Sequence, residues 1–199
     1  MNIRNLSLAI VLSGLFVQTA SAVVIFEDNF NRDNSNTVGN NWSEIEQHGN
    51  DVAVNNGMLR LRDDQNGIDA AASQLNGFST LGLIDIMLSY DWGASTNTEA
   101  ADSLFVEWRT SGSSSWTELV EHALGGSSLV GNVLQLGVLA ANQASIEFRF
   151  YTSVSANTER AFIDNVILSG RSAVSEPSTL AMMLLCLTLL GVRRKMNAS

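Results

Sequence analysis

Carboxylates are the commonest titratable side chains of this sequence. Asp28 and Asp164 each lie in a stretch with the alternation of a β-strand, on a face that otherwise bears apolar residues. A buried aspartate needs either a cation or several hydrogen bonds, and calcium binds hard oxygen ligands of this kind. Glu27 or Asp28 together with Asp164 therefore forms a candidate calcium site. The alternative is that both aspartates accept hydrogen bonds from loop N–H groups and arginine.

Few residues are available for nucleophilic catalysis. The segment 23–171 contains two histidines, His48 and His122, and neither a cysteine nor a Gly-x-Ser-x-Gly sequence. A serine or cysteine hydrolase needs a nucleophile beside a base, and zinc needs several histidine or cysteine ligands. We expect both histidines to be solvated side chains, and we expect the protein not to be an enzyme.

The four tryptophans are the remaining candidates for a binding site. Trp92 and Trp108 fall on apolar strand faces, which predicts core positions. Trp42 and Trp116 lie beside turns and are better candidates for stacking against sugar rings. The alternative for these two is that each anchors the edge of the core, with its N–H group bonded and its ring packed.

The elements that would position these residues are short strands. Runs with two-residue alternation are separated by clusters of Gly, Ser, Asn and Thr, and no strong amphipathic helix is present. About eight or nine strands of this kind predict an all-β fold, an antiparallel β-sandwich, with a jelly roll as the first choice. An immunoglobulin-like sandwich is the alternative, although its cysteine landmarks are missing. The runs are 23–30, 52–54, 58–62, 81–92, 104–109, 116–121, 145–151 and 161–168, and 133–139 fits either a strand or a turn of helix.

Both ends of the chain carry targeting signals. Arg4, an apolar run and the sequence Ala20-Ser21-Ala22 predict a secretory signal peptide over 1–22, cleaved after Ala22. Near the other end, the polar sequence Ser175-Glu176-Pro177 is followed by the uncharged run Leu180–Val192 and then by Arg193-Arg194-Lys195. As a helix this run spans roughly 20 Å, so it crosses a bilayer of roughly 30 Å by tilt or local thinning. The basic end should stay cytoplasmic.

These signals divide the chain into four parts. The signal peptide is followed by an exported ectodomain over 23–170, a linker with the sorting motif over 171–179, and a transmembrane helix with a basic cytoplasmic end over 180–199.

The C-terminal tail resembles the PEP-CTERM sorting signal of Gram-negative bacteria, which an exosortase reads. The tripeptide of that family is Pro-Glu-Pro, and Ser175-Glu176-Pro177 keeps its last two residues. The resemblance implies export through the inner membrane, transient anchoring and release to the cell surface or outside the cell. It also implies bacteria that make exopolysaccharide, with which many tagged proteins associate.

Three stretches of the ectodomain resemble concanavalin-like and carbohydrate-binding jelly rolls. They are Phe26–Arg32 with Gly39–Trp42, Asp102–Trp108 with Trp116, and Glu159–Val166. Such modules often hold a structural calcium ion between their first and last strands. Glucanases of this fold place two glutamates around an aspartate on one strand, whereas Leu83–Leu88 offers Asp85 alone.

The composition narrows the possible partners. Segment 23–171 contains seven arginines, no lysine and 19 acidic residues, which gives a formal charge of −12. Such a surface repels nucleic acid and suits neutral glycans or divalent cations. We therefore expect a non-enzymatic surface or matrix protein that associates with exopolysaccharide. A specific lectin-like carbohydrate-binding module and a glycoside hydrolase are the alternatives.

Overall fold

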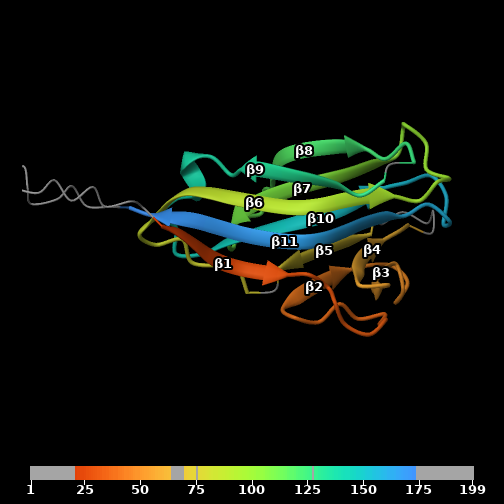
Figure 1. The fold of residues 1–199 in the computed structure, drawn as a ribbon, viewed down its shortest axis with the longest axis horizontal. Helices are drawn as coiled ribbons and strands as arrows, with labels where there is room; N and C mark the ends of the chain where they lie inside the picture. The colour runs from red at the N-terminus through yellow and green to blue at the C-terminus, as the bar shows by residue number, and fades with distance from the viewer. Residues whose placement is uncertain (1–20, 64–69, 75, 127, 174–199) are drawn as a thin grey trace, which may run out of the picture. The chain divides into compact units, whose positions relative to one another are not determined.

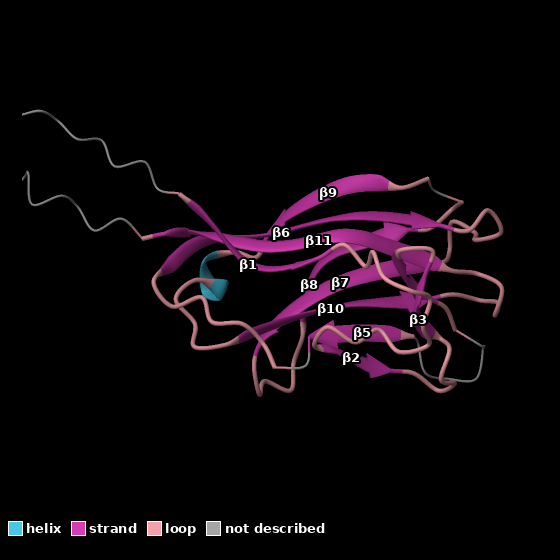
Figure 2. Cartoon of the chain, turned by 60° about the horizontal axis from the view of Figure 1, so that its bottom comes forward, coloured by secondary structure: helices cyan, strands magenta, loops and turns pink. Residues whose placement is uncertain are grey.

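The computed structural model describes residues 21–63, 70–74, 76–126 and 128–173, and Ser21–Ala173 form one compact unit. Figure 1 shows that this unit is built of strands, and Figure 2 shows that the strands form two layers. All strand pairs are antiparallel. The predicted all-β jelly-roll sandwich is thus confirmed. Within the described ranges, no helix is long and apolar enough to span a bilayer.

The larger sheet is centred on the last strand. β11 (Ala161–Ser172) pairs with β6 (Leu83–Ala94) along one edge. Along its other edge it pairs first with β4 (Met58–Leu61) and then with β1 (Ala22–Asp28). The complete order is β3 (Val52–Asn55), β4 (Met58–Leu61), β11, β6 and β9 (Val130–Gln135), with β1 (Ala22–Asp28) also paired to β11. The first and last strands therefore lie side by side.

The smaller sheet is centred on β10 (Ile146–Ser153). The order of its five strands is β2 (Trp42–Ile45), β5 (Ala71–Gln74), β10, β7 (Ser103–Thr110) and β8 (Thr117–Ala123). Because strand side chains alternate between faces, Phe148 and Phe150 point into the core while Arg149 and Tyr151 point outward. This outward face of the smaller sheet positions the candidate site described below.

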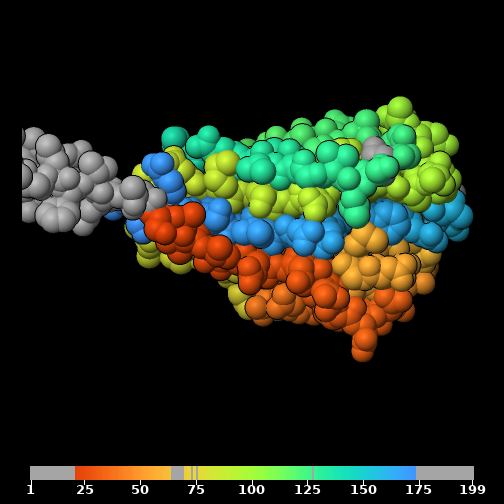
Figure 3. All heavy atoms as spheres, in the orientation of Figure 1, coloured from red at the N-terminus to blue at the C-terminus, as the bar shows by residue number. Residues whose placement is uncertain are grey.

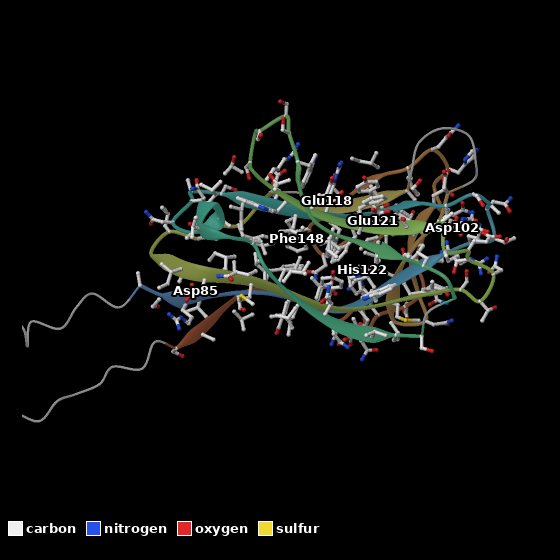
Figure 4. All side chains as sticks on the ribbon, turned by 90° about the horizontal axis from the view of Figure 1, so that it is seen from above. Asp85, Asp102, Glu118, Glu121, His122 and Phe148 are labelled. Carbon is white, nitrogen blue, oxygen red and sulfur yellow. The ribbon has the colours of Figure 1, made fainter. Side chains whose placement is uncertain are left out.

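The core fills the space between the sheets. Phe148, Phe150 and Tyr90 are almost completely buried, and Figure 4 shows Phe148 between the two layers. The Trp42 ring packs edge-on against Phe148, with 5.6 Å between the ring centroids. Burying a large apolar side chain contributes about 1.5–3 kcal/mol to the free energy of unfolding. The contact of Tyr90 with Phe150, at 5.1 Å between ring centroids, joins the two sheets.

Most strands lie where the alternation predicts them, and the exceptions are short. The hairpin at Asn56 and Gly57 is confirmed, since both residues have positive φ angles, 52° and 73°. Segment 133–139 combines both predicted alternatives, because β9 ends at Gln135 and the 3₁₀ turn η1 (Val138–Ala140) follows. β5 lies outside the predicted strand runs, because Ala71–Gln74 consists of small and polar residues without alternation.

Candidate functional site

The outer face of the smaller sheet carries alternating aromatic and charged side chains. On the central strands β7 and β10, Phe105 lies opposite Tyr151, Glu107 opposite Arg149, and Arg109 opposite Glu147. Directly opposed side chains on one face of a sheet are close enough to interact. Each opposed pair therefore joins two like aromatic rings or two opposite charges.

Two of these pairs are ion pairs that hold the arginines in place. The Nε atom of Arg149 donates to Glu107 Oε2 at 2.6 Å, and the Nε atom of Arg109 donates to Glu147 Oε2 at 2.7 Å. The arginine side chains are only 22% and 27% exposed. Both guanidinium planes are consequently fixed on the surface.

Trp116 lies on these two arginines. The guanidinium carbons of Arg109 and Arg149 are 4.1 Å and 4.4 Å from the centroid of the Trp116 ring, which is cation–π geometry. Arg149 also lies 4.9 Å from the centroid of Tyr151, whose ring stacks on Phe105 at 4.6 Å and 12°. We call Phe105, Arg109, Trp116, Arg149 and Tyr151 the aromatic–arginine cluster. It presents partly exposed rings held in fixed orientations.

This cluster suits a ligand with both apolar faces and polar edges. Binding sites of this kind use aromatic surfaces for contact and a few fixed polar groups for orientation. The remaining N–H groups of the arginines are suitable partners for hydroxyl groups, and Trp116 offers a flat ring. Of the two tryptophans predicted to bind a ligand, Trp116 is thus placed where it can do so.

Trp42, by contrast, is a core residue, and its predicted role as a ligand platform is corrected. Its side chain is buried with 5% exposure, and its Nε1 atom donates to Asp28 Oδ2 at 2.9 Å. The turn before Trp42 suggested exposure, but pairing of β2 with β5 directs the indole ring toward Phe148. This is the edge-anchoring alternative.

The carboxylate of Asp28 is surrounded by protein donors. Arg32 donates to both of its oxygens, from Nη1 at 2.7 Å and from Nη2 at 3.1 Å. The Asn40 amide, the Trp42 indole and the backbone N–H of Phe30 complete the shell. Burial alone would raise the pKa of Asp28, but the hydrogen bonds, led by those of Arg32 and Asn40, lower it below its ordinary value.

A cavity of about 430 Å³ lies beside Asp28, along β1 and β11, whose outer surfaces are seen in Figure 3. Its lining is mostly polar and consists of Glu27, Asp28, Asn29, Arg32, Asn40, Asn165, Val166 and Ile167. Asp164 is not among these residues, and burial raises its pKa.

These residues do not fit the calcium site that the sequence suggested. Both oxygens of Asp28 are engaged, and the positive charge beside them already belongs to Arg32. For Asp28 the structure shows the hydrogen-bonded alternative. Asp164 accepts a hydrogen bond from the backbone N–H of Asn165 at 2.7 Å. The exposed Glu27 contributes only to the cavity lining.

A second carboxylate group lies at the end of the sandwich opposite to the start of β1 and the end of β11, where Figure 4 labels Asp102. Oxygens of Glu99, Asp102 and Glu159 lie within 4.8 Å of one another, and Asp102 and Glu159 are almost fully buried. Hydrogen bonds to Glu159 and then to Asp102 raise the pKa of Glu99. These hard oxygen atoms are of the type that calcium prefers. No sequence pattern predicts this group, because residues 99 and 159 meet only through the packing of two loops.

His122 is partly buried, which corrects the expectation that it is solvated. Its ring stacks on Trp92 at 4.2 Å, and its Nε2 atom lies 2.7 Å from the hydroxyl group of Tyr90. Asn132 donates to that hydroxyl at 2.9 Å. Figure 4 places His122 on the inner side of β8, opposite in direction to Glu118 and Glu121. Burial lowers the pKa of His122. His48, in contrast, has a 54% exposed side chain.

The remaining predicted residues belong to the chain ends. Ala22 opens β1 and pairs with Arg171. Ala20, the sorting residues Ser175-Glu176-Pro177 and the basic residues Arg193-Arg194-Lys195 lie outside the described ranges.

Comparison with protein families identifies the C-terminal tail. The PEP-CTERM protein-sorting motif matches residues 173–195. The chain therefore carries this sorting motif, which marks a secreted, C-terminally membrane-anchored protein that is sorted to the cell surface. No curated protein matches the chain.

Several solved structures are similar in fold to this chain at low sequence identity. The K3 cleaved adhesin domain of Lys-gingipain from Porphyromonas gingivalis w83 has 12% identity and a TM-score of 0.55, over 75% of this chain and 99% of that one. A structure from work on endo-acting O-glycanases of the human gut microbiota, which initiate mucin breakdown, has 10% identity and a TM-score of 0.53, over 74% and 99%. The mannan-recognising carbohydrate-binding module TmCBM27 has 18% identity and a TM-score of 0.49, over 77% and 100%. At these identities the likeness establishes the fold.

Proposed function

We propose that this protein binds polysaccharide at the cell surface through the aromatic–arginine cluster and does not catalyse a reaction. The observation that carries the proposal is the position of Trp116, held on Arg109 and Arg149 at the outer face of the smaller sheet. An exposed aromatic ring costs free energy in water, and fixing it on the surface lowers the entropy lost when a ligand binds. The sorting tail delivers this face to the outside of the cell.

The charges of the face favour an uncharged polysaccharide. Each arginine of the cluster is neutralised by a glutamate of the same face, and the domain as a whole is acidic. An anionic polymer would meet net repulsion, whereas a neutral one can stack on Trp116 and Tyr151. The adhesin domain among the structural neighbours is consistent with a binding role.

The same ion pairs argue against a glycosidase on this face. Hydrolysis requires one carboxyl group that donates a proton and a second that attacks or activates water. Glu107 and Glu147 each accept a short hydrogen bond from an arginine, so both carboxylates are held in structural ion pairs on this face. We infer that glycan binding here is not followed by cleavage.

The test is co-sedimentation of the protein with the host's own exopolysaccharide. We expect Trp116→Ala and Tyr151→Ala each to lower the retained fraction, because each variant removes an aromatic surface on which a sugar ring can pack. Phe162→Ala is the matched control, since Phe162 is a partly buried aromatic residue on the outer face of the other sheet. Its retention should equal that of the unchanged protein.

Two outcomes would replace this proposal. Release of reducing ends that is lost in Glu107→Gln or Glu118→Gln would establish a glycosidase. Equal retention of all variants would move the binding surface elsewhere. Saturable binding of a single glycan on an array, if it is lost in Trp116→Ala, would instead narrow the function to a specific lectin.

A further inference from the structure

Exposed apolar side chains gather at the end of the sandwich where β1 begins and β11 ends. Leu81 is 61% exposed, Val138 is 85% exposed and Leu139 is 73% exposed. Val24, near the start of β1, is 55% exposed. We call Val24, Leu81, Val138 and Leu139 the apolar end patch. Large exposed apolar residues that cluster in this way mark an interaction surface.

Backbone and hydroxyl hydrogen bonds hold these segments at one end. The hydroxyl group of Thr80 donates to Ala140 O at 2.6 Å, which ties the loop containing Leu81 to η1. The N–H of Ala173 donates to the carbonyl oxygen of Gly82 at 2.9 Å, which ties the same loop to the end of β11. Val24 pairs with Ser169 of β11. Figure 2 shows η1 in cyan beside the ends of these strands.

The chain leads directly from this end to the membrane anchor. The compact unit ends at Ala173, and the apolar run of the sorting tail begins at Leu180. A fully extended chain spans at most about 3.3–3.6 Å per residue, so the connection reaches no further than about 25 Å. While the tail is anchored, the apolar end patch is therefore confined close to the bilayer surface.

Electrostatics favour the same orientation. The exposed charges beside the patch, Asp85 and Arg171, form an ion pair at 2.9 Å and contribute no net charge. The rest of the domain is strongly acidic, and acidic surfaces are repelled by anionic lipid headgroups. Turning any other face of the domain toward the membrane would bring its acidic side chains close to the anionic lipid headgroups.

We propose that the apolar end patch rests in the headgroup region of the membrane for as long as the C-terminal anchor is attached. Leu81, Val138 and Leu139 insert there, as apolar residues of interfacial segments do. The short connection supplies a high effective concentration, so weak intrinsic affinity is sufficient. Once the tail is removed, this affinity alone does not retain the domain, and it leaves the membrane.

The experiment uses the full-length protein reconstituted into phosphatidylcholine vesicles. In a Cys186→Ser background, an environment-sensitive fluorophore is attached at Leu139→Cys. The matched control carries it at Asn157→Cys, an exposed position at the opposite end of the sandwich. We expect a blue-shifted emission and quenching by spin-labelled lipid at position 139, and neither at position 157.

Two further measurements make the result decisive. Adding Leu81→Ser and Val138→Ser should reduce the quenching at position 139, because these exposed residues belong to the patch and not to the core. Absence of lipid quenching at position 139 would overturn the proposal. Energy transfer between labels on different molecules without lipid quenching would also overturn it, and would show that a second copy covers the patch.

Discussion

Asp28 and Arg32 form the ion pair that closes the loop between β1 and β2. The side chain of Asp28 is 2% exposed, and the Nε atom of Arg32 also donates to Val38 O at 3.1 Å. A guanidinium group provides several directed donors at once, so one side chain neutralises the aspartate and fixes the loop. The positive charge beside Asp28 is therefore the guanidinium group of Arg32, and not a bound cation.

Arg32→Gln should lower the free energy of unfolding by about 1–3 kcal/mol, the range for hydrogen bonds to a charged group, toward the lower end because Arg32 is 32% exposed. The buried carboxylate would lose its bidentate partner. Arg171→Gln is the control, since its ion pair with Asp85 is exposed and should contribute less than about 1 kcal/mol. Urea unfolding of both variants measures the difference.

A calcium titration checks the same account. Because Arg32 occupies the position beside Asp28, Asp164→Ala should leave any effect of calcium on the melting temperature unchanged. A calcium-induced rise in melting temperature that disappears in Asp164→Ala would show that an ion does join Asp164 to the first strand.

The sequence revealed the problem at Asp28 but not its solution. Alternation placed an aspartate on an apolar strand face, which requires either a cation or several donors. Which of these applies depends on Asn40 and Trp42, twelve and fourteen residues away, and on the path of the loop that returns them. Trp116 could be selected for its place beside a turn, whereas its support by Arg109 and Arg149 depends on strand register.

At the scale of elements, β8 is an edge strand of the smaller sheet and β9 an edge strand of the larger sheet, and a group of polar side chains joins them across the core. His122 of β8 contacts Tyr90 of β6, and Asn132 of β9 donates to the same hydroxyl group. Asn132 also approaches His122 Nε2 at 3.3 Å. Because Asn132 can only donate there, this nitrogen acts as an acceptor, which requires a neutral imidazole.

This arrangement predicts a loss of stability in mild acid. Burial lowers the pKa of His122 in the folded protein below its ordinary value of 6.5. The unfolded chain therefore binds the proton first as the pH falls, so the stability is fully present above 6.5 and decreases as the pH falls through the lowered pKa. His122→Gln should remove part of the loss between about pH 7.5 and pH 5. The measurement is the free energy of unfolding against pH.

His48→Gln is the control for that titration, since its side chain is more than half exposed. An equal change of slope in both variants would contradict the role assigned to the β8–β9 contact.

Strand prediction succeeded where alternation was long or where an Asn-Gly turn marked a hairpin, as between β3 and β4, and it missed two other short strands. β6, β7, β10 and β11 were located from their apolar faces. β2 and β5, with four residues each, show neither a long alternation nor a turn signal of that kind. β5 pairs with the edge of β10, and β2 pairs with β5. The pairing order of the two sheets requires contacts between distant segments and was not available from the sequence.

At the scale of the whole molecule, targeting and binding are separate. The PEP-CTERM motif at 173–195 determines where the protein goes, and the sandwich carries the surface that we propose binds polysaccharide. The motif could be recognised from sequence because its order of polar tripeptide, apolar run and basic residues is local. Binding of the glycan depends on surfaces that form only in the folded protein, so the sequence alone does not identify the glycan. The sequence does not identify the processing enzyme either.

Processing of the tail is the prediction at this scale. In a Gram-negative host that has an exosortase, we expect the mature protein to begin at Val23 and to end near Ser175-Glu176-Pro177. Replacing Arg193, Arg194 and Lys195 by serine should impair membrane retention before processing, because the charges that stop transfer are lost. Intact-mass spectrometry of surface-released protein checks both ends. A released form that still contains Leu180–Lys195 would contradict exosortase processing.

The position of β11 has a mechanical consequence. The strand is flanked by β6 on one edge and by β1 and β4 on the other, and its last residues lead into the tail. A pull on the tail acts along the axis of β11, so it shears the flanking hydrogen bonds together instead of opening them one at a time. Force applied to the tail of a tethered cell-surface protein would then act first on β11, which is paired with three other strands.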